Sequence, residues 1–434
     1  MPHFDEHPLR RALSDEIHAR PPVPLGSPEA VTYLAFLHHD GSAVRETVHL
    51  RRLAEELGLP EPDTDSGHLS LDAGTFRLKW ERHNEFSSYA FFRRTDAAEA
   101  ARRADDHALQ AVPPDWYRDI PGQLMVATHI ALRPVADMPP DEAIAGLSPS
   151  GATMVASRVA DGAGWVFTDF HIIDGFSRFL VLDATLTPRQ AGRTVQRLLE
   201  IETYRVMALL AFPLAKEVGR LLSRAEDELA GLTEAMGRTT SCDDERAVLG
   251  RLTRLAAEVE QSVARSTFRF GAATAYYRLV QQRIEELREQ RVTGYPTIRE
   301  FMERRLSPAI STCTTIARRQ EDLSARVARN SQLLRTRVEI ELERQNQQLL
   351  AQMNRRAKLQ LRLQETVEGL SIVAITYYGS QLVNYLAKGA KDLIAPATPE
   401  LATAIAIPLI ATLVFLGLRR MRREVAAEQA GMEH

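Results

Sequence analysis

The sequence predicts an α+β protein with an N-terminal mixed α/β sheet domain, a long coiled-coil-like helical stalk and a C-terminal two-helix transmembrane hairpin. Three observations lead to this prediction. Strand-like runs are confined to the first part of the chain, the composition changes sharply after Thr187-Pro188, and two charge-free apolar stretches lie near the end. The expected limits are 1–187 for the sheet domain, 188–368 for the stalk, 369–418 for the hairpin and 419–434 for a basic cytoplasmic tail.

The sheet domain is predicted from alternating apolar and polar residues. Leu9, Leu13 and Ile17 repeat at helical spacing, which indicates a short amphipathic helix over 8–19. Seven strands are expected, rich in aromatic and β-branched residues: Val31–His38, Thr75–His83, Ser87–Arg94, Leu124–Arg133, Thr153–Val159, Trp165–Ile172 and Arg178–Asp183. Helices are expected at Ser42–Leu57 and Ala97–Gln110. Asp161-Gly162 and Asp174-Gly175 are typical of tight hairpins, so this edge of the sheet should be antiparallel.

The stalk is predicted as a series of long helices. Residues 188–236 should be helical with a kink or break at Pro213, because proline removes a backbone donor. The next helix should be capped by Ser241 or Asp243 and run to Arg291. The last helix should start near Pro296, with a bend at Pro308, and continue to Gly369.

The last stalk helix carries a narrow apolar stripe. Its members recur mostly at four- and seven-residue spacing: Leu333, Leu334, Val338, Leu342, Leu349, Met353 and Leu359. Gln345, Gln348 and Gln352 interrupt the stripe. Two interpretations stay open, a coiled-coil-like seam and a solvated helix lying on its own neighbours. We expect packing against residues 188–291, self-association through helices 296–387, or both, because so polar a helix needs partners in water.

The hairpin is predicted from Gly369 to Ala387 and from Leu401 to Leu418. At 1.5 Å per residue these helices would be about 27–29 Å long, close to the hydrocarbon thickness of a bilayer. The alternative is a buried core hairpin of a soluble protein, since the first segment contains several polar residues.

The flanking charges predict the orientation of the hairpin. Basic residues precede the first span (Arg355, Arg356, Lys358 and Arg362) and follow the second (Arg419, Arg420, Arg422 and Arg423), whereas the loop offers Lys388 and Lys391. This bias places both termini in the cytoplasm. The first residues have no apolar core, so no signal peptide is expected.

Composition limits the function classes. The formal net charge of −3 gives no general attraction to nucleic acid, and no nucleic-acid partner is expected. The two cysteines, Cys242 and Cys313, are far apart and suggest a reducing compartment.

Catalytic and cofactor motifs are missing from the sequence. There is no phosphate-binding loop, dinucleotide fingerprint, GxSxG or HExxH, so we expect no enzyme, no cofactor and no metal site. The group His38-His39-Asp40 is interpreted as strand-end residues, because adjacent side chains point to opposite sheet faces. Asp169 and His171 share a predicted strand face, and either a polar sheet face or a metal site with a third ligand would explain them.

The first span has a polar face. Tyr377, Gln381 and Asn384 lie at i, i+4 and i+7, and Lys388 continues the face. Polar groups in a bilayer are costly unless they bond across helices or face water, so the face holds helices together or lines a pore. The arginines at 419–423 serve as a topology signal, and contact with anionic lipid would be compatible.

Four segments resemble the bacterial family called domain of unknown function 3422. They are HPLRRALSDEIHARPP at the start, LLEIETYRVMALLAFPLA at 198–215, FRFGAATAYYRLVQQRIEELREQR at 268–291 and LQLRLQETVEGLSIVAITYY at 359–378. The resemblance implies a membrane-anchored bacterial protein and brings no activity. Together with the predicted hairpin, it leads us to expect a multi-pass inner-membrane location. A motif of the family's N-terminal signature is interpreted as docking this segment on the domain, with a ligand site as the alternative: Glu16, His18, Arg20 and Pro21.

The layout is also similar to CorA-type divalent-cation channels. Those carry a Gly-Met-Asn motif at the outer end of the first span, whereas the nearest string here, Tyr378-Gly379-Ser380, lies within the span. The leading hypothesis is a non-enzymatic, homo-oligomeric inner-membrane protein that presents a cytoplasmic α/β domain on a helical stalk. The alternative is a CorA-like ion channel or transporter whose first span lines the pore.

Overall fold

The protein consists of two compact units. The computed structural model describes residues 7–11, 13–14, 21–38, 41–96, 107–147, 153–238, 241–389 and 398–431. The first unit comprises Met1–Thr239 and Ala247–Gln332, and the second comprises Thr240–Arg246 and Leu333–His434. The α+β class with long helices is therefore confirmed. The sheet and most of the helices assigned to the stalk share one unit, and the domain limits proposed above stay a prediction.

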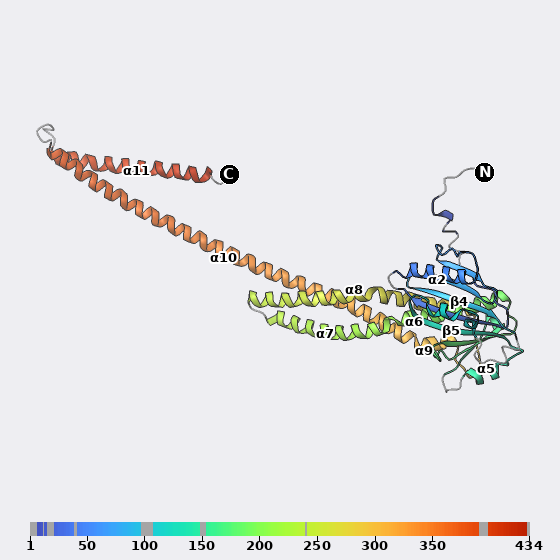
Figure 1. Cartoon of the computed structure of the whole chain (residues 1–434). Helices are drawn as coiled ribbons and strands as arrows, with labels where there is room; N and C mark the ends of the chain where they lie inside the picture. Colours follow the sequence, from blue (N-terminus) through green and yellow to red (C-terminus); the bar gives the residue numbers. More distant parts are fainter. Residues whose placement is uncertain are drawn as a thin grey trace. The chain divides into compact units, whose positions relative to one another are not determined.

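The first unit contains a β-sheet (Figure 1). Within the described residues it has nine strands, in the order β2-β3-β4-β1-β5-β8-β7-β6-β9. The strands are β1 Glu29–Leu37, β2 His68–Asp72, β3 Arg77–Arg82, β4 Phe86–Arg94, β5 Gln123–Pro134, β6 Val155–Val159, β7 Gly164–Thr168, β8 Ser177–Asp183 and β9 Gln290–Arg291. Neighbours pair antiparallel except β5 and β8, which pair parallel. The predicted Asp-Gly turns lie between β6 and β7 and between β7 and β8. Both strand pairs are antiparallel, so the antiparallel prediction is confirmed for this part of the sheet.

One face of the sheet carries the larger core. The cross-strand neighbours Leu34, Tyr89 and Trp80 project from this face and are buried with Trp116. The elements associated with this face are short: α2 Ser42–Glu56, the 3₁₀ helix η1 Ala108–Ala111, α4 Pro114–Arg118 and α5 Pro140–Leu147. Trp116 donates its indole N–H to the backbone oxygen of His49 at 2.8 Å, so the aromatic core also fixes α2.

The opposite face is covered in part by α6, Pro188–Leu209. The helix begins at a capping box in which Thr187 and Gln190 satisfy each other's backbone N–H groups, and Pro188 occupies the first turn. Its apolar side chains Val195 and Leu199 face the sheet residue Tyr33 across a small cavity. The sequence change at Thr187-Pro188 therefore marks the start of a helix that packs on the sheet.

A proline-rich segment, residues 21–28, crosses α6 at Gly192. A β-carbon built at Gly192 would lie 2.0 Å from the backbone oxygen of Val23, so only glycine allows the proline-rich segment to approach α6 this closely. Leu25 donates its N–H to the Pro188 oxygen at 3.0 Å. The buried carboxylate of Glu29 accepts from the Gly26 N–H at 2.9 Å and pairs with Arg77.

Further helices, long except for α9, complete the first unit. They are α7 Ala211–Arg238, α8 Cys242–Leu287, α9 Ile298–Arg305 and the first part of α10, Ser307–Gly389. The buried residues of α7 alternate at four- and three-residue spacing, which is coiled-coil geometry: Ala211, Ala215, Val218, Leu222, Ala225, Leu229 and Leu232. Arg319 of α10 pairs with Glu226 of α7 at 2.7 Å, and Arg251 of α8 pairs with Glu228 at 3.4 Å. This stretch of α10 is thus packed against its own neighbours.

A polar cluster lies inside this helix packing. The side-chain amide of Gln320 donates to Ser262 at 2.8 Å and accepts from Ser266 at 2.9 Å. All three side chains are buried. The cluster connects α8 with α10 and defines how the two helices are aligned along their length.

The second unit contains the rest of α10 and α11, Pro399–Gly431. The two helices run antiparallel and diverge from the end where α10 finishes and α11 begins (Figure 1). A β-carbon at Gly379 would lie 3.3 Å from Ile410, which shows that the helices approach closely at this glycine. The α10 helix continues through Gly369 without a break.

Several predicted boundaries differ from the structure. The break expected at Pro213 occurs at Leu210, and the bend expected at Pro308 follows α9 at Leu306, because proline is tolerated in the first turn of the helix that follows. The strand expected at Trp165–Ile172 ends at Thr168, and the helix expected to reach Arg291 ends at Leu287. Strand β2 and helices α4 and α5 were not predicted. Of the helix expected at Ala97–Gln110, residues 97–106 lie outside the described residues, and part of the N-terminal helix does as well.

Candidate functional site

The apolar helix α11 is the main candidate for a functional surface in the second unit. Among the described residues, one helix is long and apolar enough to cross a membrane, Glu400–Arg420, with a mean hydropathy of 2.4 and 0% of its most apolar window buried. Tyrosine and amide side chains lower the hydropathy of the earlier segment at the end of α10. The described residues therefore contain one candidate span. The predicted two-span hairpin stays a proposal.

The polar face predicted on α10 is only partly covered by α11. Tyr377 is 59% exposed, whereas Gln381 and Asn384 are half-buried. Ser380 and Ala387 are the buried residues at this end of α10. The side of α10 against α11 is therefore centred on small residues next to the predicted face.

The basic residues predicted as topology signals lie at helix surfaces where the structure describes them. Lys388, Arg419 and Arg420 are exposed. The side chains of Arg422 and Arg423 lie outside the described part of the chain. Their role as topology or lipid contacts stays a prediction.

The N-terminal motif is described only at its last member. Glu16, His18 and Arg20 lie outside the described residues. The backbone oxygen of Pro21 accepts a hydrogen bond from the ammonium group of Lys79 at 3.2 Å. Beside it, the proline-rich segment and strands β2 and β3 enclose a hollow of about 340 Å³. The docking role of the motif stays a prediction.

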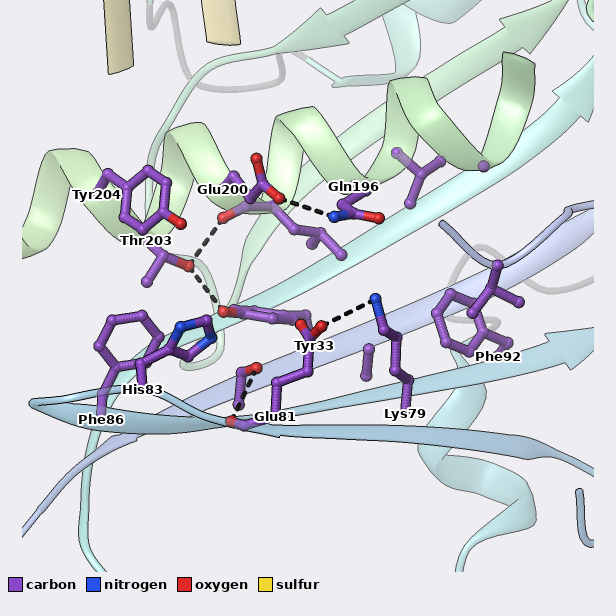
Figure 2. Close-up of a pocket in the computed structure, with 16 residues that line it drawn as sticks. Tyr33, Lys79, Glu81, His83, Phe86, Phe92, Gln196, Glu200, Thr203 and Tyr204 are labelled. Atoms are coloured by element: carbon purple, nitrogen blue, oxygen red, sulfur yellow. Dashed lines mark hydrogen bonds and ion pairs between the residues drawn. The ribbon is translucent and has the colours of Figure 1, made fainter. Parts of the chain in front are cut away.

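A cavity between α6 and the sheet is an enclosed candidate site of the first unit (Figure 2). It has a volume of about 50 Å³ and lies between the ring of Tyr33 and the helix. The hydroxyl of Thr203 is 3.0 Å from that of Tyr33, and Lys79 pairs with Glu81 at 3.0 Å. Phe86 and Phe92 form part of the apolar lining of the cavity.

The cavity offers both hydrogen-bond donors and acceptors. Gln196 donates its amide N–H to Glu200 at 2.8 Å, while its side-chain oxygen is buried with no partner among the described residues. Burial raises the pKa of Tyr33, so its hydroxyl stays neutral and acts as a hydrogen-bonding group, not as a base. The volume suits ordered water or a molecule of a few heavy atoms.

The cavity residues were missed in the sequence, although α6 contains a usable signal. Gln196, Glu200 and Thr203 are polar residues at i, i+4 and i+7 on a helix that is otherwise apolar toward the sheet. A polar row on a core-facing helix indicates either hydrogen-bonded partners or a polar cavity.

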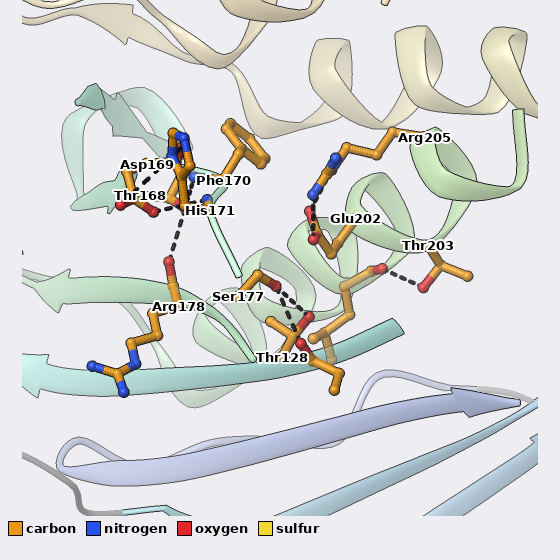
Figure 3. A network of polar contacts seen from close by, with 12 residues as sticks. Thr128, Thr168, Asp169, Phe170, His171, Ser177, Arg178, Glu202, Thr203 and Arg205 are labelled. Atoms are coloured by element: carbon orange, nitrogen blue, oxygen red, sulfur yellow. Dashed lines mark hydrogen bonds and ion pairs between the residues drawn. The ribbon is translucent and has the colours of Figure 1, made fainter. Parts of the chain in front are cut away.

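Asp169 and His171 lie in the loop after β7 and do not share a strand face (Figure 3). Asp169 accepts from the His171 backbone N–H at 2.9 Å, and its carboxylate is 3.8 Å from the His171 ring nitrogen. Between them Phe170 has a φ of 55° and stacks on Phe301 at 4.8 Å. The carboxylate thus stabilises a turn in which an aromatic residue adopts a left-handed conformation.

The predicted histidine group at the end of β1 is described only at His38. Its ring lies 2.9 Å from the Ser87 hydroxyl, which donates to the buried carboxylate of Glu46 at 2.9 Å. His39 and Asp40 lie outside the described residues. No group of three or more His, Cys, Asp or Glu able to hold a metal ion occurs in the part of the chain that the structure describes.

His129 should make the first unit sensitive to acid. Its ring stacks on His107 and Phe176 and lies 2.9 Å from the Thr32 hydroxyl. Burial, reinforced by His107 and Arg178, lowers its pKa from 6.5 to about 3. Since the unfolded chain binds the proton first, stability is complete above pH 6.5 and falls as the pH drops toward 3.

We expect the free energy of unfolding to fall between pH 7 and pH 5, and His129→Asn to remove roughly 1–2 kcal/mol of that loss. Urea unfolding at the two pH values measures the effect. His171→Asn, at an exposed histidine, is the control. An unchanged pH dependence in His129→Asn would contradict the assignment.

The comparison with protein families gives one match over nearly the whole chain. Residues 5–425 match the family described as Protein of unknown function (DUF3422). The chain belongs to this family. The resemblance seen in the four sequence segments is confirmed, and the family supplies no biochemical activity.

Other comparisons add little. No curated protein matches the chain. A solved structure described as "structure of the full-length CmaX protein" is 13% identical, with 70% of this chain and 91% of that chain covered and a TM-score of 0.19. A likeness at this level carries no argument about fold or function. The comparisons give no support to the similarity in layout with CorA-type channels.

Proposed function

We propose that this protein is a non-enzymatic membrane protein that holds its α+β unit at the cytoplasmic surface of the bacterial inner membrane. The observation that carries the proposal is α11, whose segment Glu400–Arg420 exposes its apolar side chains along its length. Exposed apolar surface costs about 25 cal/mol per Å² in water, and a bilayer removes that cost. In this proposal the end of α10 forms the first span of a hairpin and α11 forms the second.

Two features support the hairpin. The antiparallel contact between Gly379 and Ile410 lies near the middle of both segments, so their apolar stretches are aligned. Arginines lie at the outer ends of the two segments, and the loop has fewer basic residues. This arrangement favours cytoplasmic termini.

Self-association through residues 296–387 is part of the proposal. From Leu349 to Leu386 most of the large apolar residues of α10 are exposed, whereas between Ala309 and Val327 they are buried. A helix that exposes this much apolar surface in the absence of neighbours is stabilised by partners.

Topology reporters on the full-length chain test the proposal. Green fluorescent protein after His434 should fluoresce, and alkaline phosphatase inserted between Gly389 and Thr398 should be active. The protein should stay in the pellet after carbonate extraction. Carbonate-soluble protein would refute anchoring, and active phosphatase after His434 would refute the hairpin.

A further inference from the structure

A regular seam runs along α10 in the second unit. Its residues alternate at four- and three-residue spacing and form what we call the α10 seam: Leu363, Val367, Leu370, Ala374, Tyr377, Gln381 and Asn384. This is the 3.5-residue repeat of a coiled coil. The seam begins before the predicted membrane boundary at Gly369 and continues past it.

The α10 seam is covered by α11 only in part. The close approach to α11 is at Gly379, and the adjacent Ser380 and Ala387 are buried. Leu363 and Leu370 of the seam are 67% and 72% exposed, whereas Gln381 and Asn384 are half-buried. The two surfaces are adjacent on one helix, so the intramolecular hairpin leaves most of the seam accessible and its two amides partly accessible.

We propose that the α10 seam binds the α10 seam of a second copy of this chain, parallel and in register. The inference rests on the proposed membrane hairpin and deepens its self-association. Any partner must present an apolar surface that passes from water into lipid at the same height. A second copy does so by construction.

The amides of the seam favour an identical partner. Gln381 and Asn384 each carry a donor and an acceptor, so the same side chain at the same depth in a second copy can satisfy both groups. An unpaired amide in hydrocarbon is costly, and interhelical amide bonds stabilise membrane helix pairs. An antiparallel copy would bring these amides opposite apolar positions of the seam, where they would stay unpaired.

Cysteine cross-linking of full-length protein in membranes tests the inference, in a parent carrying Cys242→Ser. Cys313 is buried and can stay. Leu363→Cys and Asn384→Cys occupy the same seam position three heptads apart. The matched controls Leu361→Cys and Leu382→Cys share one off-seam position three heptads apart, and both are about as exposed as Leu363, at 60% and 62%.

We expect a disulfide-linked dimer at positions 363 and 384 to form on the order of tenfold faster than at 361 and 382, because paired seams hold equivalent residues at high effective concentration. Equal rates, or faster linkage at the controls, would overturn the seam. Membrane pelleting of each variant is measured in parallel. Loss of pelleting in the parent would refute the proposed anchoring instead, so the two failures are distinguishable.

Discussion

Replacing Gly192 with alanine should destabilise the first unit more than any other single methyl group added to a helix there. The new β-carbon would lie 2.0 Å from the Val23 oxygen and 2.9 Å from the Val23 carbonyl carbon. Both are backbone atoms, so no side-chain rotation relieves the overlap. Residues 21–28 are held in place against this overlap, because the N–H of Leu25 donates a hydrogen bond to Pro188 and the N–H of Gly26 donates one to Glu29.

The expected loss is roughly 3 kcal/mol or more in the free energy of unfolding, at the upper end of the overpacking range. Urea unfolding followed by circular dichroism measures it. Gly231→Ala in α7 is the matched control, since nothing lies within 4 Å of its β-carbon. That variant should gain up to about 1 kcal/mol. Equal stability of the two variants would show that residues 21–28 do not cross α6 as described.

Introducing arginine at Leu409 and Leu413 together should release the protein from membranes. The two residues lie near the middle of Glu400–Arg420, one turn apart, and are 58% and 62% exposed. Each arginine near the centre of a spanning helix costs roughly 2.5–3.5 kcal/mol. Because both would face lipid, partition into the bilayer should fall by several orders of magnitude.

Flotation of full-length protein with phospholipid vesicles measures this partition. Val44→Arg/Val48→Arg is the matched control, because these valines are also one turn apart on an exposed helix face, at 70% and 60% exposure in α2. The control should float like the parent. If the α11 variant also floats fully, the helix is not what attaches the protein to the membrane.

The sheet was largely predictable because its central strands alternate clearly. Strands β1, β4, β5 and β8 were placed within about two residues of their observed ends. Strand β2 was missed because it is a short edge strand with polar residues at both ends. The strand at 165 was extended too far, since alternation continues through Phe170 although its backbone turns into the left-handed region.

The candidate sites were less predictable because they depend on contacts between distant residues. Tyr33 of the sheet and Thr203 of α6 are hydrogen-bonded through their hydroxyls, and no local sequence pattern predicts that contact. The spacing of Tyr377, Gln381 and Asn384 is visible in the sequence. The small residues that approach α11, among them Gly379, became evident only once the two helices were in place.

The amide of Gln320 has a consequence for how the long helices find their alignment. If α10 slid by one heptad, Cys313 or Val327 would replace it between Ser262 and Ser266. The two hydroxyls would lose their interhelical partner and the displaced amide would be buried among apolar side chains, at about 1–3 kcal/mol for each unsatisfied group. The shifted helix packing would therefore be less stable, and α8 and α10 would adopt a single register.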